Sequence, residues 1–312
     1  MKHLYLCIIC LFSWQTFSQS SKDAVTPFLE NIVIQFPNVR DLALNQEKDE
    51  AVFSAQSVMG DISVLVYVKK VNDVWINPEV ISFSGRYFDL EPFFSKDGLE
   101  LYFVSNRPMD QTSEKTKDFD IWYVTRDSKQ EQWSKPKNIG APINTEMDEF
   151  YPSIANNKNL YFTLDNPKLN QKDDIYVSEF KNGEYTQPRR LGDGINSNGY
   201  EFNAFVSSDE SFLIYTCYNK EGGYGSGDLY ISRRTENGEW SPAENMGNGI
   251  NSDKMEYCPF VDESTNTLYF TSKRNSLKPT FQSTVNLKEL IETFNSYENG
   301  LSRLYQVNLK QR

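Results

Sequence analysis

Histidine is almost absent from this chain of 312 residues. The single histidine, His3, lies within residues 1–18, which have the layout of a cleavable secretory signal. Removal of this segment would leave a mature chain of 312 − 18 = 294 residues with no histidine. The absence of histidine excludes Ser-His-Asp catalysis, Cys-His catalysis and histidine-ligated metal sites in that mature chain.

Cysteine and long hydrophobic runs are also scarce. Cys7 and Cys10 fall inside the signal segment, which leaves Cys217 and Cys258 in the mature chain. Export permits a disulfide between them, although Cα atoms more than about 7 Å apart forbid the bond. The sequence therefore leaves two alternatives open, a Cys217–Cys258 disulfide and two separate buried thiols.

The longest apolar run extends from Leu4 to Trp14, which is about 11 residues and too short to span a bilayer as a helix. Lys2 precedes the run, and the small residues Thr16 and Ser18 follow it before Gln19. This pattern is typical of a signal peptide rather than of a retained anchor. We therefore expect an exported chain, periplasmic or secreted, with a signal at 1–18, one domain at 19–312 and no transmembrane segment.

Positive charge is outnumbered, with 32 Lys and Arg against 43 Asp and Glu and a formal net charge of −11. Nucleic acid and anionic lipid surfaces repel such a chain, so neither is an expected partner. Hydrophobic content is low at 38%, whereas aromatic content is high at 14%. The core is therefore predicted to consist mainly of Phe, Tyr and Trp side chains.

Internal repetition organises the whole chain. Four similar segments and a degenerate fifth each begin on an acidic residue, and these starts are 48, 60, 52 and 55 residues apart: Asp41, Asp89, Glu149, Glu201 and Glu256. Each unit contains a short strand, a polar turn, an aromatic strand, a variable loop and a third strand, and every unit except the last adds a Pro-containing edge strand. This spacing and content predict four-stranded antiparallel propeller blades.

The count of units predicts five blades, with six as the alternative. The last unit ends at its third strand, Leu304–Leu309, and the spare segment Thr26–Asn38 resembles a fourth strand. We expect these two segments to pair and to close the ring, since closure removes the open sheet edge. One segment breaks the β pattern: residues 286–296 place Leu287, Leu290, Ile291 and Phe294 on one helical face, which predicts a short inserted helix.

These units resemble a known repeat. The segment from Asp89, DLEPFFSKDGLELYFVSNR, followed by DIWYV and WSKPKNIGAPIN, is similar to the WD40-like repeat of TolB-type β-propellers. The resemblance covers nearly all of the mature chain, and similar repeats occur in bacterial envelope proteins, notably of the Bacteroidetes type. It implies a protein-interaction scaffold in the envelope and transfers no catalytic residues.

The acidic starts are the main candidates for a site. First strands line the central channel of a propeller, so Asp41, Asp89, Glu149, Glu201 and Glu256 are expected to form a ring near one mouth of the channel. Such a ring could bind a cation such as Ca²⁺, which prefers oxygen ligands. The alternative is that each acid accepts backbone hydrogen bonds or pairs with a basic residue that ends a second strand: Arg107, Lys220 or Arg274.

The loops between second and third strands offer a second candidate surface. The polar loop 108–118, the glycine-rich loop 221–228 and the insertion 275–300 occupy the same blade position and are expected on one face. The glycine-rich loop leads into a strand rather than a helix, so it does not fit a phosphate-binding loop. This face is the expected partner site.

The preferred functional hypothesis is an exported, monomeric, non-enzymatic scaffold that binds an envelope protein and needs no cofactor. The alternative is a carbohydrate-active propeller, either a glycan-binding lectin or a glycoside hydrolase. Glycoside hydrolases need only two carboxyl groups, so the absence of histidine does not exclude one. This alternative requires a central pocket with two carboxyl groups held unlike the others.

Overall fold

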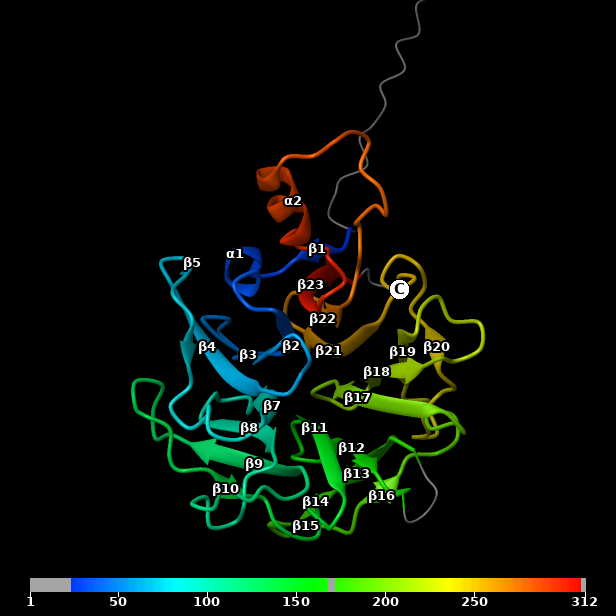
Figure 1. Cartoon of the computed structure of the whole chain (residues 1–312). Coiled ribbons are helices and arrows are strands. Elements are labelled where there is room, and N and C mark those ends of the chain that lie inside the picture. The colour runs from blue at the N-terminus through cyan, green and yellow to red at the C-terminus, as the bar shows by residue number, and fades with distance from the viewer. Residues whose placement is uncertain (1–23, 168–171, 310–312) are drawn as a thin grey trace, which may run out of the picture.

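The computed structural model describes residues 24–167 and 172–309. Five antiparallel sheets surround a common axis, so the chain is a five-bladed β-propeller, as the repeat count predicts (Figure 1). The predicted signal peptide, residues 1–18, lies outside the described residues.

Blades 1 to 4 each take their strands from one repeat, with the first strand of the repeat nearest the axis. Blade 1 contains β2 (Asn38–Leu44), β3 (Glu50–Gln56), β4 (Ser63–Val71), β5 (Val74–Trp75) and β6 (Glu79–Val80). Blade 2 contains β7 (Asp89–Phe94), β8 (Glu100–Ser105), β9 (Asp120–Thr125) and β10 (Lys137–Asn138). Blade 3 contains β11 (Asp148–Ile154), β12 (Leu160–Asp165), β13 (Asp174–Ser178) and β16 (Arg189–Arg190), with a hairpin of β14 (Phe180–Lys181) and β15 (Glu184–Tyr185) beside it.

The last two blades continue this arrangement. Blade 4 contains β17 (Tyr200–Val206), β18 (Phe212–Tyr218), β19 (Gly227–Arg233) and β20 (Glu244–Asn245). Blade 5 contains β21 (Glu256–Asp262), β22 (Thr267–Ser272), β23 (Arg303–Asn308) and, as its outer strand, β1 (Thr26–Pro27).

The predicted closure of the ring is confirmed. β1 pairs antiparallel with β23, with Thr26 opposite Gln306 and Pro27 opposite Tyr305. The pairing is shorter than the predicted segment, because Glu30–Val33 form a helical turn, α1, whose Ile32 and Val33 are buried. The first and last parts of the described chain thus complete one blade.

The short edge strands are fixed by a repeated asparagine. Three repeats contain a Gly-x-x-Ile-Asn sequence, which ends at Asn144, Asn196 or Asn251. Each side chain accepts a hydrogen bond from a backbone N–H of the neighbouring third strand and donates one to the carbonyl of the same residue: Ile121, Ile175 and Leu229, respectively. This two-way bond substitutes for ladder hydrogen bonds that a two-residue strand cannot make.

Buried aromatic side chains pack between the blades, but Val, Leu, Ile and Ala together outnumber them in the core, so the prediction of a mainly aromatic core is wrong. Phe53, Phe103, Trp122, Phe162 and Phe270 are among the largest fully buried side chains. They come from the second and third strands of their blades, which alternate between the two faces of each sheet. The core is therefore a set of inter-blade layers around the axis.

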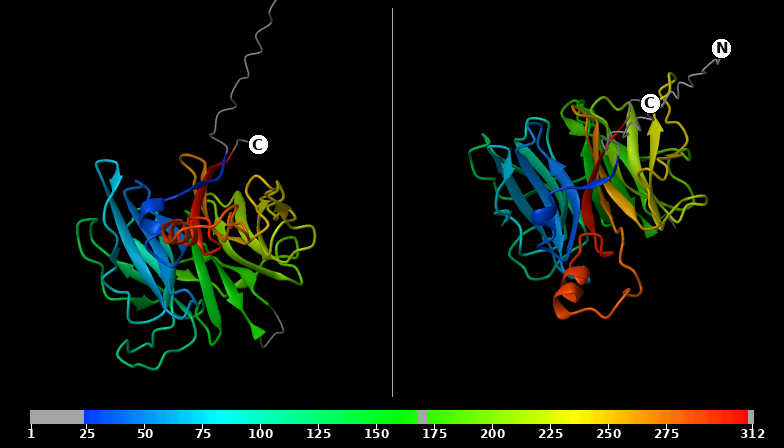
Figure 2. Two further views of the ribbon diagram at one scale, coloured as in Figure 1. Left: turned by 45° about the horizontal axis from the view of Figure 1, so that its top comes forward. Right: turned by 90° about the horizontal axis from the view of Figure 1, so that it is seen from above.

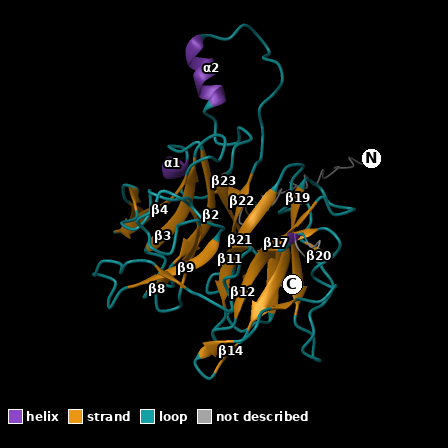
Figure 3. Cartoon of the chain, turned by 60° about the horizontal axis from the view of Figure 1, so that its bottom comes forward, coloured by secondary structure: helices purple, strands orange, loops and turns teal. Residues whose placement is uncertain are grey.

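The predicted inserted helix is confirmed as α2 (Leu287–Phe294), which begins with a capping box between Asn286 and Glu289. The helix stands away from the blades on one face of the propeller (Figures 2 and 3). None of its residues is buried. In the described part of the chain, no helix has the length and apolar character needed to cross a membrane.

Candidate active site in the central cavity

All five inner strands are interrupted at the same place by a β-bulge. In β2, for example, the pairing with β3 passes from Arg40 opposite Ser54 to Ala43 opposite Val52, so one extra residue is inserted. The same shift occurs in β7, β11, β17 and β21. The first residue of every bulge has a left-handed φ between 51° and 59°, although none of these residues is glycine: Asp41, Glu91, Tyr151, Asn203 and Cys258.

A left-handed φ in a non-glycine residue is strained and persists only where the surrounding structure enforces it, most often at functional sites. A bulge also redirects the side chain that it carries. Here five bulges at equivalent positions turn five chemically different side chains toward the axis. The backbone therefore repeats in all five blades, whereas the side chains at the five bulges differ. We call these five bulge residues the bulge centre.

The sequence contains prolines that mark three of these bulges, and the comparison of the repeats did not use them. Pro92, Pro152 and Pro259 directly follow three of the five bulge residues and lie inside innermost strands. Proline inside a sheet is confined to edges and bulges, so these residues mark the interruption.

Arg40 connects the bulge residues electrostatically. Its Nε donates to Asp41 Oδ1 at 2.6 Å, and its Nη2 donates to Glu91 Oε1 at 2.8 Å. Asn203 Nδ2 also donates to Glu91 Oε1, at 3.1 Å, and the backbone N–H of Tyr151 donates to Glu91 Oε2 at 2.7 Å. Glu91 Oε2 accepts no other hydrogen bond from the described residues, which leaves one position on this oxygen for the proton of the neutral acid.

Cys258 completes the network from the other side. Its thiol donates to Asp41 Oδ1 at 2.6 Å and lies 3.3 Å from Asn203 Oδ1. Burial raises the pKa of this thiol well above its usual value, which keeps Cys258 a neutral donor. Asp41 Oδ1 thus accepts hydrogen bonds from both Arg40 and Cys258.

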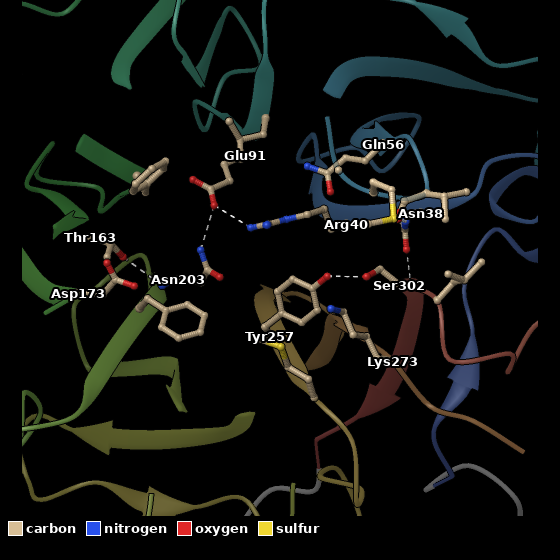
Figure 4. A pocket seen from close by; sticks show the side chains of 18 of the residues that line it. Asn38, Arg40, Gln56, Glu91, Thr163, Asp173, Asn203, Tyr257, Lys273 and Ser302 are labelled. Atoms are coloured by element: carbon tan, nitrogen blue, oxygen red, sulfur yellow. Dashed lines mark hydrogen bonds and ion pairs between the residues drawn. The ribbon is translucent and has the colours of Figure 1, made fainter. Parts of the chain in front are cut away.

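A cavity of about 480 Å³ opens on this centre (Figure 4). Arg40, Glu91 and Asn203 contribute to its lining from the axis. Its wall includes the aromatic side chains Phe150, Phe202 and Tyr257, together with the polar residues Asn38, Gln56, Thr163, Asp173, Lys273 and Ser302. The cavity is also lined by residues from three of the loops that join second and third strands: 58–60, 173 and 300–301. The cavity therefore opens on the face of the propeller that these loops form.

The Glu91 carboxyl group is held as a weak acid. Burial raises its pKa to about 8 against the opposing effect of Arg40, and the negative charge of Asp41 raises it further. Its side chain is only 3% exposed. At neutral pH the neutral form of Glu91 therefore predominates, which gives the cavity a proton donor.

A second cavity-lining carboxyl group has a smaller shift. Burial raises the pKa of Asp173 to about 6, and the nearby carboxylates Asp165, Asp174 and Asp148 add to the increase. Asp173 comes from the loop before β13, on a different blade from Glu91. Near pH 7 the cavity thus contains one carboxyl group that is mainly neutral and one that is mainly ionised, which is the division of roles required for acid–base chemistry.

The structure separates Asp41 from the other acids of the predicted ring. The pairing of inner and second strands shows which residues are equivalent in the five blades. In blade 1 the equivalent residue is Val39, not Asp41; in the other four blades it is one of the predicted acids: Asp89, Glu149, Glu201 and Glu256. These four acids lie two residues before the bulge residue of their strands, and none of them lines the central cavity. The structure therefore brings Asp41 together with Glu91 and Cys258 instead.

Each of the four remaining acids is buried with hydrogen-bond donors around it. Asp89 accepts from Ser84 and forms an ion pair of 2.6 Å with Arg107. Glu149, Glu201 and Glu256 each accept from the hydroxyl and the backbone N–H of a Thr or Ser four residues earlier: Thr145, Ser197 and Ser252. Lys220 lies 3.7 Å from Glu201, and Arg274 lies 3.8 Å from Glu256.

Burial raises the pKa of Glu149 to about 8 as well, although this group lies off the cavity. Among residues 24–167 and 172–309, no group of three or more His, Cys, Asp or Glu side chains is arranged to hold a metal ion. The two cysteines of the proposed disulfide, Cys217 and Cys258, are both free and buried in the structure.

No protein-family model matches the chain, and no curated protein matches it. Solved structures do. A glycoside hydrolase matches with a TM-score of 0.54 at 7% identity over 86% of each chain. A thermostable family-43 glycoside hydrolase matches with a TM-score of 0.50 at 14% identity over 77% of this chain and 84% of the other. An α-L-arabinofuranosidase from Lactobacillus brevis matches with a TM-score of 0.49 at 14% identity over 86% and 91%.

These matches correct two predictions. The TolB-type assignment is not supported, because the similar propellers are glycoside hydrolases. The prediction of a non-enzymatic envelope scaffold is wrong for the same reason. At 7–14% identity the likeness itself establishes only the fold, so an argument for activity must come from this chain's own cavity.

Proposed function

We propose that this protein is a glycoside hydrolase whose central cavity binds a saccharide, with Glu91 as proton donor and Asp173 as base. The observation that carries the proposal is the position of Glu91. It is a buried carboxyl group with a pKa of about 8, and it lines a cavity that has aromatic and hydrogen-bonding walls.

The cavity chemistry suits a sugar. Its volume of about 480 Å³ lies within the range of small-molecule sites, about 300–1,000 Å³. Phe150, Phe202 and Tyr257 offer apolar surfaces for the C–H faces of a sugar ring. Asn38 and Gln56 are among the polar groups that can hydrogen-bond its hydroxyls.

The proposed reaction is a single displacement. Glu91 transfers its proton to the glycosidic oxygen as the bond from that oxygen to the anomeric carbon breaks. The Asp173 carboxylate accepts a proton from a water molecule whose oxygen bonds to the anomeric carbon. One product is the free alcohol and the other the reducing sugar, and both carboxyl groups return to their starting states by exchange with solvent.

Arg40 and Asp41 act on Glu91 rather than on the substrate in this scheme. Arg40 lowers the pKa of Glu91, whereas Asp41 raises it. Burial, which raises this pKa most, acts together with Arg40 and Asp41 to hold it close to the working pH, where a general acid is most effective. Cys258 and Asn203 fix the two carboxyl groups in place through the hydrogen bonds given above.

The test is release of reducing sugar from a panel of oligosaccharides and plant, algal and bacterial polysaccharides. We expect turnover by the intact protein and a loss of at least about 100-fold in kcat for Glu91→Gln. Glu149→Gln is the matched control, because Glu149 has a similarly raised pKa but lies off the cavity. Thermal melts verify that both variants are folded.

Two results would contradict the proposal. One is glycan binding without any turnover, which would indicate a lectin. The other is equal loss of turnover in both folded variants, which would remove Glu91 from its assigned role. The predicted signal peptide further leads us to propose that the reaction takes place outside the cytoplasm, in the periplasm or after secretion.

A further inference from the structure

A second cavity of about 260 Å³ adjoins the central one. The two cavities share Met255, Lys273 and Gly300 in their linings. The second cavity is completed by Ser226 from the glycine-rich loop, Asp253 and Lys254 from the connection between blades 4 and 5, and Asn275 from the insertion in blade 5. A ligand in the central cavity can therefore extend past Lys273 into this space.

The glycine-rich loop forms one wall of the second cavity because glycine allows very close packing. A Cβ atom on Gly225 would lie 1.6 Å from the Lys254 carbonyl oxygen, and one on Gly227 would lie 2.9 Å from Met255 Cγ. The Ser226 N–H donates to that Lys254 carbonyl at 3.1 Å, and Gly227 forms a parallel bridge with Met255. The loop is thus fastened to the connection between blades 4 and 5, and this contact fixes the position of Ser226.

Three hydrogen-bond donors at this cavity have no partner within the described residues: Lys273 Nζ, Asn275 Nδ2 and Ser226 Oγ. The Lys273 backbone is anchored, because its N–H donates to the Met255 carbonyl at 3.0 Å. Asn275 uses only its side-chain oxygen, which accepts from the Leu277 N–H. Ammonium, amide and hydroxyl donors are the groups that bind a carboxylate or a sulfate ester.

The local charge has the matching sign. The other lysine of the second cavity, Lys254, forms an ion pair of 2.9 Å with Asp253, and Lys273 forms no ion pair with any of the described carboxylates. The charge of the central cation, Arg40, is compensated by the Asp41 carboxylate, which lies 2.6 Å from Arg40 Nε. Asp173 lies on a different part of the central cavity, with further carboxylates around it. The joined cavities are therefore positive at Lys273 and negative at Asp173.

We propose that the second cavity is a subsite for an anionic group on the saccharide, the carboxylate of a uronic acid or a sulfate ester, with Lys273 as the residue that determines this specificity. The proposal rests on the proposed saccharide hydrolysis in the central cavity and names the class of its substrate. Lys273 forms a charge-assisted hydrogen bond with the anion, and Asn275 and Ser226 donate to its remaining oxygens. The anion then orients the saccharide so that its glycosidic bond lies over Glu91.

The test begins with a glycan array of neutral, uronic-acid-containing and sulfated oligosaccharides, probed with the intact mature protein. Titration calorimetry then compares the strongest ligand with its carboxyl-reduced or desulfated form. We expect the anionic form to bind at least about tenfold more tightly than its modified form. A loss of affinity on carboxyl reduction identifies a uronic acid as the ligand, and a loss on desulfation identifies a sulfate ester. Lys273→Met should abolish this difference by weakening binding of the anionic form, whereas Lys273→Arg should retain most of the difference.

Lys254→Met is the matched control, because Lys254 is already paired with Asp253, and it should retain the preference. Equal affinity for the neutral and anionic forms would overturn the subsite while Glu91-dependent hydrolysis of neutral saccharides remained. So would an equal loss of affinity for both forms in Lys273→Met. Absence of binding to any saccharide would overturn the proposed function together with the subsite.

Discussion

Removal of Arg126 should destabilise the propeller strongly, because this side chain joins blades 1 and 2 through a buried ion pair. Its guanidinium donates to both oxygens of Glu50 at 2.9 and 2.5 Å, and the two side chains are 3% and 2% exposed. It also donates to the Gly98 carbonyl and lies 4.2 Å from the centre of the Trp133 ring. Arg126→Met keeps most of the packing volume but removes all of these polar contacts.

The magnitude follows from the environment of the remaining carboxylate. Removing one partner of a buried ion pair lowers the free energy of unfolding by about 3–5 kcal/mol, since the other partner remains buried with an uncompensated charge. Tyr67 and Asn45 still donate to Glu50, at 2.8 and 3.1 Å, so we expect the lower end, about 3 kcal/mol. With a urea m-value of about 3 kcal/mol/M, the unfolding midpoint should fall by about 1 M.

A second arginine provides the control for this effect. Arg234 in blade 4 lies 4.1 Å from the centre of the Trp240 ring and 3.9 Å from Glu210, but these two charged side chains are 26% and 15% exposed. Arg234→Met should cost only about 0–1 kcal/mol, because solvent screens this pair. Urea unfolding of both variants, followed by circular dichroism, makes the comparison. Equal losses, or less than about 1 kcal/mol for Arg126→Met, would refute the reasoning from burial.

Three further predictions concern the central site. Arg40→Met should raise the pKa of Glu91 above about 8, since Arg40 lowers it, and the alkaline limb of the pH–rate profile should move upward with it. Asp173→Asn should lower kcat at least about 100-fold and remove the decrease in rate below about pH 6. Gly225→Ala should weaken binding of anionic saccharides more than of neutral ones, measured by calorimetry, because the new Cβ would displace the loop that positions Ser226.

The blades and their closure could be predicted from the sequence because each blade is a local unit. Turn residues, aromatic second strands and Pro-containing edge strands recur in every repeat, and these features act over a few residues. The pairing of Thr26–Pro27 with Tyr305–Gln306 followed from counting strands. The helical turn of α1 within the closing segment was not foreseen, and it forms because Ile32 and Val33 pack into the core.

The central site could be predicted only in outline. The repeat alignment placed Asp41 with the acidic starts, whereas strand register places it two positions further on, at a bulge. The network of Arg40, Glu91 and Cys258 joins residues up to 218 positions apart and depends on left-handed backbone that short-range patterns do not specify. The repeat motif reflects how strands pack within a blade, so it carried no information on the cavity, and the functional inference drawn from it was wrong.

The most direct test of the account is the pH dependence of kcat/KM for saccharide hydrolysis by the intact protein. Activity requires Asp173 ionised and Glu91 protonated, so it should rise through about pH 6 and fall through about pH 8. Glu91→Gln should leave at most a small residual rate without the fall near pH 8. A profile that stays flat from pH 7 to 10, or a Glu91→Gln variant with the same alkaline limb as the unaltered protein, would contradict the assignment of Glu91 as the proton donor.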